Sequence, residues 1–299
     1  MWLEASSAGA LLGCASLATI FVGSLYLAPA SVRHRGHDDE VQIKWRFRST
    51  AITCILSPLA LLFWKVSPED GNYGSTGPSL FHWIGVRTAG LVDATILPLS
   101  LVIVLFTGPL VDMYLIFRRA RATGQIEKFT FDQFFPNCPE NPVVQIRNLI
   151  AAPFAEELVF RCCMGALLKA ANWRHAFIIG FAPLFFGVAH LHHCHGMIKE
   201  GMPVKRAIII SLVQMTYTTL FGALEMFFFL RTGHLISVFL IHSWCNLLGL
   251  PPLGFLGKTH PNHEHAAFII FGYISGIFIF VMGLGPLTSP ELYKNQIYS

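Results

Sequence analysis

The chain alternates long apolar stretches with short polar ones. Residues 5–32 contain no charged side chain. Further apolar stretches follow at about 49–65, 89–117, 146–170, 176–195, 206–230, 234–250 and 266–287. A helix needs about 20 apolar residues to cross the hydrocarbon core of a bilayer. The pattern therefore predicts an all-α, polytopic membrane protein with about eight transmembrane helices in one bundle.

Proline residues interrupt the third stretch. Pro98 and Pro109 each remove a backbone donor from residues 89–117, so we expect this segment to be kinked or partly re-entrant. The longest polar connection, about 118–145, is rich in arginine and proline. No internal repeat or separate soluble domain is visible, and we expect residues 1–299 to form a single integral membrane domain.

Composition agrees with this prediction. Hydrophobic residues make up 54% of the chain and charged residues 13%, and the mean hydropathy is +0.55. A soluble domain carries about 25% charged residues, so a soluble globule, a disordered chain and a nucleic-acid binder are all disfavoured. The seven cysteines lie mostly in apolar sequence, which is typical of reduced, structural thiols. We do not expect a cleaved signal peptide, because no basic residue precedes the first stretch.

Basic residues indicate the orientation in the membrane. Most of the 21 Lys and Arg residues fall in one set of alternate loops, including the clusters at 33–48, 118–128 and 199–206. Short loops rich in Lys and Arg stay on the cytosolic side. We therefore expect these loops to be cytosolic and both termini to lie on the opposite side.

The fourth stretch contains three ionisable residues. A charge at the centre of a bilayer costs about 2.5–3.5 kcal/mol on insertion scales, so Glu156, Glu157 and Arg161 need an explanation. Glu157 and Arg161 are four residues apart and can neutralise one another as a buried structural ion pair. Glu156 projects about 100° away and has no comparable partner in the local sequence. It is therefore the functional candidate.

The fifth stretch ends in a group of histidines. His190 is the deepest, and His192, His193 and His195 follow around Cys194. Imidazole and thiolate groups are zinc ligands, so the group is a candidate metal site. A polar cluster at the membrane interface explains the outer histidines equally well. A single helix histidine such as His190 is most often a packing residue.

The seventh stretch places His242 and Asn246 one helical turn apart. Both side chains therefore reach the same region. Hydrogen bonding between helices, worth about 0.6 kcal/mol, is the simplest explanation for either residue alone.

Depth connects the three stretches. If the basic loops are cytosolic, Glu156 lies about 12 Å, His190 about 8 Å and His242 about 12 Å below the same surface, at a rise of about 1.5 Å per residue. We therefore expect one site in an intramembrane cavity open to the cytosol, with the motif-bearing core at about 146–250.

These side chains favour hydrolysis of an amide. A carboxylate and a histidine can activate a water molecule, while a second histidine and an amide donate to the tetrahedral oxyanion. Other protease chemistries lack their motifs: no His-Glu-x-x-His or Gly-x-Ser-x-Gly sequence is present, and Asp93 and Asp112 lie in one stretch. The sequence therefore predicts a protease that forms no covalent acyl-enzyme.

Three spaced motifs resemble the signature of the type II CAAX prenyl endopeptidases. They are Glu156-Glu157-x-x-x-Arg161, Phe186-x-x-x-His190 and His242-x-x-x-Asn246. The stretches 43–58 and 83–109 are also similar to the amino-terminal half of these enzymes, so the resemblance covers most of the chain.

The resemblance implies an endoplasmic-reticulum enzyme that removes the C-terminal tripeptide from farnesylated or geranylgeranylated CAAX proteins, such as Ras-type GTPases. It implies that Glu156 and His190 activate water and that His242 and Asn246 form the oxyanion hole. Supporting roles fall to Glu157, Arg161 and Phe186.

We expect a glutamate-dependent mechanism with no metal and no cofactor, because only two of the histidines lie deep. A zinc-dependent protease using the same residues and a non-catalytic membrane scaffold of the same superfamily remain alternatives. A transporter is a third alternative, disfavoured by the absence of repeats.

Overall fold

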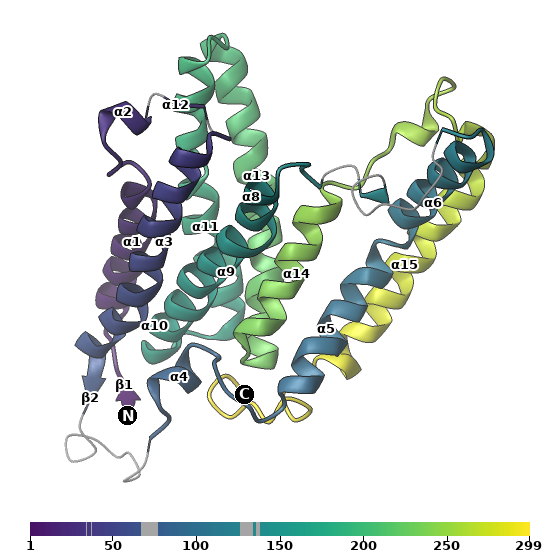
Figure 1. Ribbon diagram of the computed structural model, residues 1–299. Coiled ribbons are helices and arrows are strands. Elements are labelled where there is room, and N and C mark those ends of the chain that lie inside the picture. The colour runs from purple at the N-terminus through teal and green to yellow at the C-terminus, as the bar shows by residue number, and fades with distance from the viewer. Residues whose placement is uncertain (34, 37, 67–76, 126–133, 136–137) are drawn as a thin grey trace.

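The computed structural model describes residues 1–299 except positions 34, 37, 67–76, 126–133 and 136–137 (Figure 1). Most of the described chain is helical. The amino-terminal elements are β1 (Trp2–Leu3), α1 (Ser7–Ser24), α2 (Ala30–Arg33), α3 (Glu40–Ala60), η1 (Leu61–Trp64), β2 (Lys65–Val66), α4 (Leu80–Trp83), α5 (Leu91–Leu105) and α6 (Thr107–Ala122).

The remaining elements carry the three motifs and the carboxyl-terminal helix. They are α8 (Pro142–Ile146), η3 (Arg147–Ala151), α9 (Ala152–Glu156), η4 (Glu157–Cys163), α10 (Met164–Ala170), α11 (His175–Ala189), α12 (His192–Lys199), α13 (Val204–Thr232), α14 (Leu235–Leu248), η5 (Gly254–Leu256), η6 (His263–His265) and α15 (Ala266–Leu287). The two short strands β1 and β2 pair antiparallel.

The prediction of an all-α polytopic fold is confirmed. Each predicted apolar stretch coincides with helix, although α3 begins at Glu40, well before residue 49. Within the described residues, five helices are long and apolar enough to cross a membrane, and α5 with α6 make six if this bent pair is one span. The short helix α14 and the composite helix at 142–170 fall outside that number, so eight crossings stay a prediction.

Large apolar side chains cover the outer surface of the bundle. Phe63 is 87% exposed, Leu220 on α13 is 68% exposed and Phe271 on α15 is 66% exposed. Exposed apolar area on this scale is unfavourable in water, whereas a lipid environment solvates it. The chain is a multi-pass membrane protein, and we expect these side chains to face lipid.

The predicted kink in the third stretch is present at one of its two prolines. α5 and α6 meet at an angle of 68°, and the break lies at Phe106. Pro109 in the first turn of α6 has no N–H to donate to the carbonyl of Leu105, which explains the position of the break. Pro98 remains inside α5, which continues to Leu105.

The helices form two connected parts (Figure 1). α15 packs along α5 and α6, and α14 connects this layer to the rest of the bundle through its contacts with α5. α1 and α3 pack against η4 on the other side, next to the antiparallel pair α11 and α13. Both termini lie at one end of the molecule and α12 at the other (Figure 1). All seven cysteines are free thiols, as predicted.

Candidate active site

The first motif lies on a helix with unusual geometry. Residues 142–170 form one continuous helix, composed of α8, η3, α9, η4 and α10, in which η3 and η4 are π-helical. A π-helical turn is wider than an α-helical turn and occurs often at functional sites. Glu156 is the last residue of α9 and Glu157 the first of η4, so the two carboxylates lie where the geometry changes.

Pro153 explains how α14 docks on this helix. Its ring has no N–H, so one carbonyl of the preceding turn lacks its helical donor. The Asn246 amide Nδ2 donates to the Asn148 carbonyl at 2.9 Å, and the Ser243 Oγ donates to the Leu149 carbonyl at 2.7 Å. The third motif is therefore held against the first by two backbone carbonyls of the turn before Pro153.

Beneath this contact lies a sealed group of ionisable side chains. The His242 Nδ1 is 2.6 Å from the Glu157 Oε1, and the Glu157 Oε2 is 3.2 Å from the Arg161 Nε. Glu157 is 0% exposed, Arg161 1% and His242 4%. The Arg161 guanidinium also stacks 4.0 Å above the ring of Phe186. The pairing of Glu157 with Arg161 expected from the sequence is thus present.

Glu225 completes what we call the buried cluster, which consists of Glu157, Arg161, Glu225 and His242. Glu225 is fully buried on α13, and its carboxylate interacts electrostatically with Glu157 and Arg161. Sequence analysis missed this residue. The available signal was the only acidic residue of the 29-residue helix α13, in its long apolar part. Because a charge within the membrane is costly, this residue was a functional or structural candidate for the same reason as Glu156.

Glu156 lies outside the buried cluster. Its side chain is 20% exposed, and its Oε2 is 3.7 Å from the His242 Nε2. His242 therefore lies between two carboxylates, with one ring nitrogen facing Glu157 and the other facing Glu156. A rotation of about 100° between adjacent helix positions separates the two glutamates, as the helical geometry predicts.

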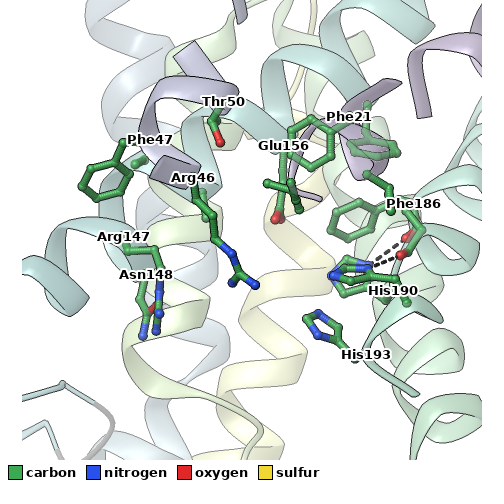
Figure 2. A pocket seen from close by; sticks show the side chains of 17 residues that line it. Phe21, Arg46, Phe47, Thr50, Arg147, Asn148, Glu156, Phe186, His190 and His193 are labelled. Carbon is green, nitrogen blue, oxygen red and sulfur yellow. Dashed lines mark hydrogen bonds between the residues drawn. The ribbon is translucent and has the colours of Figure 1, made fainter. Parts of the chain in front are cut away.

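The side chain of Glu156 faces a cavity of about 240 Å³ (Figure 2). The cavity lies between α1, α3, the η3–α9 segment, α11 and α12. Its lining residues are Phe21, Val22, Leu25, Arg46, Phe47, Thr50, Arg147, Asn148, Ala151, Ala152, Glu156, Phe160, Phe186, Ala189, His190, His192 and His193. Apolar and ionisable side chains therefore meet at one surface that reaches the Glu156 carboxylate.

His190 lies at the end of α11 on the cavity wall. Its Nδ1 is 2.7 Å from the carbonyl oxygen of Phe186, four residues earlier on the same helix. Because a carbonyl can only accept, Nδ1 carries the proton in this contact and Nε2 is left as the acceptor. Phe186 therefore supports two functional candidates, stacking under Arg161 with its ring and orienting His190 with its backbone.

Two arginines form the opposite wall of the cavity (Figure 2). Arg147 on η3 forms an ion pair with Asp38 at 2.8 Å and donates to Asn148. Arg46 on α3 also lines the cavity, yet it has neither ion pair nor hydrogen bond among the described residues. In the sequence these arginines contributed only to the prediction of orientation, because their place in the cavity depends on how distant helices pack.

The structure brings most of the predicted site residues together. Glu156, Phe186 and His190 line the cavity, and His242 reaches Glu156 from the buried cluster. Asn246 is the exception, since it is exposed and is not among the residues that line the cavity. Its amide instead binds the carbonyl of Asn148, which does line the cavity.

The histidine-rich segment does not form a compact ligand set. His192 and His193 line the cavity beside His190, and the His192 Nδ1 is 2.6 Å from the Ala189 carbonyl. Across the described residues, no group of three or more His, Cys, Asp and Glu side chains is arranged to hold a metal ion.

Comparison with known proteins gives a consistent result. The family described as type II CAAX prenyl endopeptidase Rce1-like matches residues 139–248. The chain is 35% identical to CAAX prenyl protease 2 of Homo sapiens over 281 residues, which cover 94% of this chain and 81% of the human one. It is 32% identical to CAAX prenyl protease 2 of Arabidopsis thaliana over 299 residues, covering 95% and 90% of the two chains. No solved structure matches significantly.

Proposed function

Since the chain belongs to the type II CAAX prenyl endopeptidases, a family of membrane peptidases, we propose that it cleaves prenylated CAAX proteins in the cavity beside Glu156. The reaction removes the C-terminal tripeptide after the prenylated cysteine. The observation that carries this proposal is the position of Glu156, a cavity-facing carboxylate 3.7 Å from His242 on the wall that also holds His190.

Glu156 and His190 activate the hydrolytic water. Glu156 accepts a proton from the water as it attacks the scissile carbonyl, which forms the new carbon–oxygen bond. His190 orients the same water through Nε2, because Nδ1 is committed to the Phe186 carbonyl. Collapse of the tetrahedral intermediate breaks the carbon–nitrogen bond, and the proton on Glu156 passes to the leaving amine. Glu156 then returns to its ionised form without a covalent intermediate.

His242 and Asn246 stabilise the oxyanion. With its Nδ1 proton directed at Glu157, His242 needs a second proton on Nε2 to donate to the substrate oxyanion. Asn246 uses one amide N–H on the Asn148 carbonyl and retains the other for the oxyanion. A single oxyanion donor contributes about 10²–10³-fold in rate.

The buried cluster positions these groups. Glu157 fixes the orientation of His242, and Arg161 balances the charge of Glu157 while stacking on Phe186. Such partners hold a reacting group in one rotamer, so that no binding energy is spent on orienting it. We assign Glu157, Arg161 and Phe186 to positioning and not to contact with substrate.

The cavity suits an amphipathic substrate. Phe21, Val22, Leu25 and Phe47 form an apolar side from α1 and α3, next to the ionisable wall. A prenyl chain is a hydrocarbon that belongs in lipid, whereas the peptide attached to it arrives from water. We propose that Ras-type GTPases with farnesyl or geranylgeranyl groups enter here from the cytosolic side of the endoplasmic-reticulum membrane. We further propose that residues 1–299 act as one domain with its motif-bearing core at about 146–250.

Cleavage of matched peptides by the purified protein tests this function. Two peptides of identical sequence, one farnesylated at the CAAX cysteine and one not, are incubated with protein in lipid nanodiscs, and the tripeptide is quantified by mass spectrometry. We expect release from the farnesylated peptide and little from the other. Equal cleavage of both would refute prenyl recognition. Complete inactivity on both would favour the non-catalytic scaffold.

A further inference from the structure

We propose that Arg46 binds the free C-terminal carboxylate of the substrate and thereby sets the length of the peptide released. This inference rests on the proposed function and assigns one further residue to the same cavity. Arg46 extends from α3 into the cavity, on the wall that faces His190 (Figure 2). The cavity thus has a cation at one side and the proposed catalytic carboxylate at another.

No ion pair of the described chain neutralises Arg46, and the Asp38 carboxylate attracts its charge only from beyond ion-pair distance. Its Nε is buried and has no hydrogen-bond partner, and no carboxylate of the described residues lies within 4.0 Å of its guanidinium. The nearby Asp38 carboxylate forms its ion pair with Arg147, at 2.8 Å. Buried or partly buried guanidinium groups are normally paired, because desolvation of an unpaired cation is costly. An anion from outside the chain is therefore the missing partner.

Arginine matches a carboxylate in shape as well as charge. Its planar guanidinium presents parallel N–H groups that bind both carboxylate oxygens at once. Every CAAX substrate ends in a free carboxylate until its tripeptide is removed. Of the two cavity arginines, Arg46 is the one without an ion pair in the described chain, whereas Arg147 has Asp38 and Asn148. The geometry therefore assigns this role to Arg46.

The dimensions of a tripeptide fit this arrangement. Three extended residues span at most about 10 Å, so a carboxylate held at one wall places the scissile carbonyl near another wall of the same small cavity. Arg46 and Glu156 both line this cavity, whose volume is about 240 Å³. With its carboxylate on Arg46, a peptide with one extra residue places its scissile carbonyl beside Glu156 only by bending within the same small space. We therefore expect release of three residues to be favoured.

A comparison of acid and amide substrates tests the proposal. A farnesylated CAAX peptide is prepared with a free C-terminal carboxylate and, separately, with a C-terminal amide that lacks the charge. We expect the wild-type protein to cleave the acid about 10–100-fold more efficiently in kcat/KM, mainly through KM, from the strength of a charge-assisted hydrogen bond. Arg46→Gln removes this preference, lowering kcat/KM on the acid to the value on the amide, and Arg46→Lys restores part of it.

Arg48→Gln is the matched control. Arg48 lies on the same helix, is exposed to solvent and contacts the ring of Trp45 at 5.9 Å, so it is outside the cavity lining. We expect Arg48→Gln to retain the full preference for the acid. Equal losses on acid and amide in Arg46→Gln would overturn the proposal, because Arg46 would then act through folding, through the charge of Glu156 or by holding a lipid phosphate.

Peptide binding separates this proposal from the proposed function. The affinity of each farnesylated peptide is measured on the Glu156→Gln protein by fluorescence anisotropy, which requires no turnover. Weaker binding of the amide, abolished by adding Arg46→Gln, supports the carboxylate site even if the wild-type protein releases no tripeptide. Equal affinity for acid and amide refutes the site, even if the wild-type protein cleaves both peptides.

Discussion

The cavity wall and the buried cluster contain the same kinds of side chain and differ in how far those side chains are exposed and in which of them form ion pairs. Glu157 in the buried cluster is 0% exposed and is matched by Arg161 and His242. Glu156, the adjacent residue, has a 20% exposed side chain, and its nearest ionisable partner is the His242 Nε2 at 3.7 Å. The two carboxylates are separated by a single helical step.

This difference indicates that the two groups of residues have different roles, one in the reaction and one in positioning. A fully buried group in an ion pair holds its position and is out of reach of a substrate, whereas a partly exposed group at the cavity can exchange protons or bind a charge. The two arginines differ in the same way: Arg161 is buried in an ion pair and stacked on Phe186, whereas Arg46 at the cavity has no ion pair or hydrogen bond among the described residues. We therefore locate the activation of water at the cavity wall and rigidity in Glu157 and Arg161, with His242 linking the two regions.

Glu156→Gln is the variant with the largest expected effect on turnover. The amide keeps the size of the side chain but cannot accept a proton from water, and general-base catalysis contributes about 10²–10⁴-fold. We expect kcat on a farnesylated peptide to fall by a factor in this range while the thermal unfolding midpoint stays unchanged. Substantial turnover by Glu156→Gln would show that another group is the base.

Arg161→Met removes the ion pair of the buried cluster and leaves the side chains of the cavity wall unchanged. Removal of one partner from a buried ion pair costs about 3–5 kcal/mol, because the other charge stays buried without compensation. We expect a clear drop in the thermal unfolding midpoint, measured in the same nanodiscs as Glu156→Gln, with activity lost in parallel. The comparison fails if Arg161→Met unfolds at the wild-type temperature yet is inactive, since Arg161 would then act in catalysis directly.

The sequence was sufficient for contacts that depend on helical spacing. Glu157 pairs with Arg161 because residues four apart share a helix face, and Glu156 points elsewhere for the same reason. The break between α5 and α6 was similarly expected, since Pro109 cannot donate a backbone hydrogen bond.

Contacts between helices that are distant in the sequence could not be predicted from helical spacing. The approach of Arg46 on α3 to the cavity depends on how α3 packs against η3 and α9, and the burial of Glu225 beside Arg161 depends on the packing of α13. Pro153 in the sequence indicates that a backbone carbonyl one turn earlier needs another donor. The sequence does not indicate that this donor is Asn246, because Asn246 lies 98 residues away from Asn148.

Asn246→Ala and Ser243→Ala together test whether α14 also contains one residue that acts in the reaction and one that acts only in stability. Each variant removes one hydrogen bond to a carbonyl of η3, so each should lower stability by about 0.5–1.5 kcal/mol. Only Asn246 is assigned to the oxyanion, and we expect kcat to fall about 10²-fold further in Asn246→Ala than in Ser243→Ala. Thermal unfolding and single-turnover cleavage measure the two effects separately.

Equal activity of the two variants would place Asn246 with the structural residues. In that case the division between cavity wall and buried cluster would leave the third motif with His242 as its only oxyanion donor. The exposure of Asn246 and its hydrogen bond to the Asn148 carbonyl would then fully account for an amide side chain at position 246.

Removal of divalent cations is the change with the smallest expected effect. The cavity wall already contains Arg46 and Arg147, and a divalent cation beside Glu156 would add like charge to the same small space. His190 and His242 each have Nδ1 engaged, with the Phe186 carbonyl and with Glu157, so each has one nitrogen left. We therefore expect turnover of the farnesylated peptide to be unchanged after dialysis against a chelator, with a zinc peptidase treated in parallel as the control. Activity that disappears on dialysis and returns only with zinc would contradict this expectation. Glu156 would then contact a metal ion, and not only the water and the substrate.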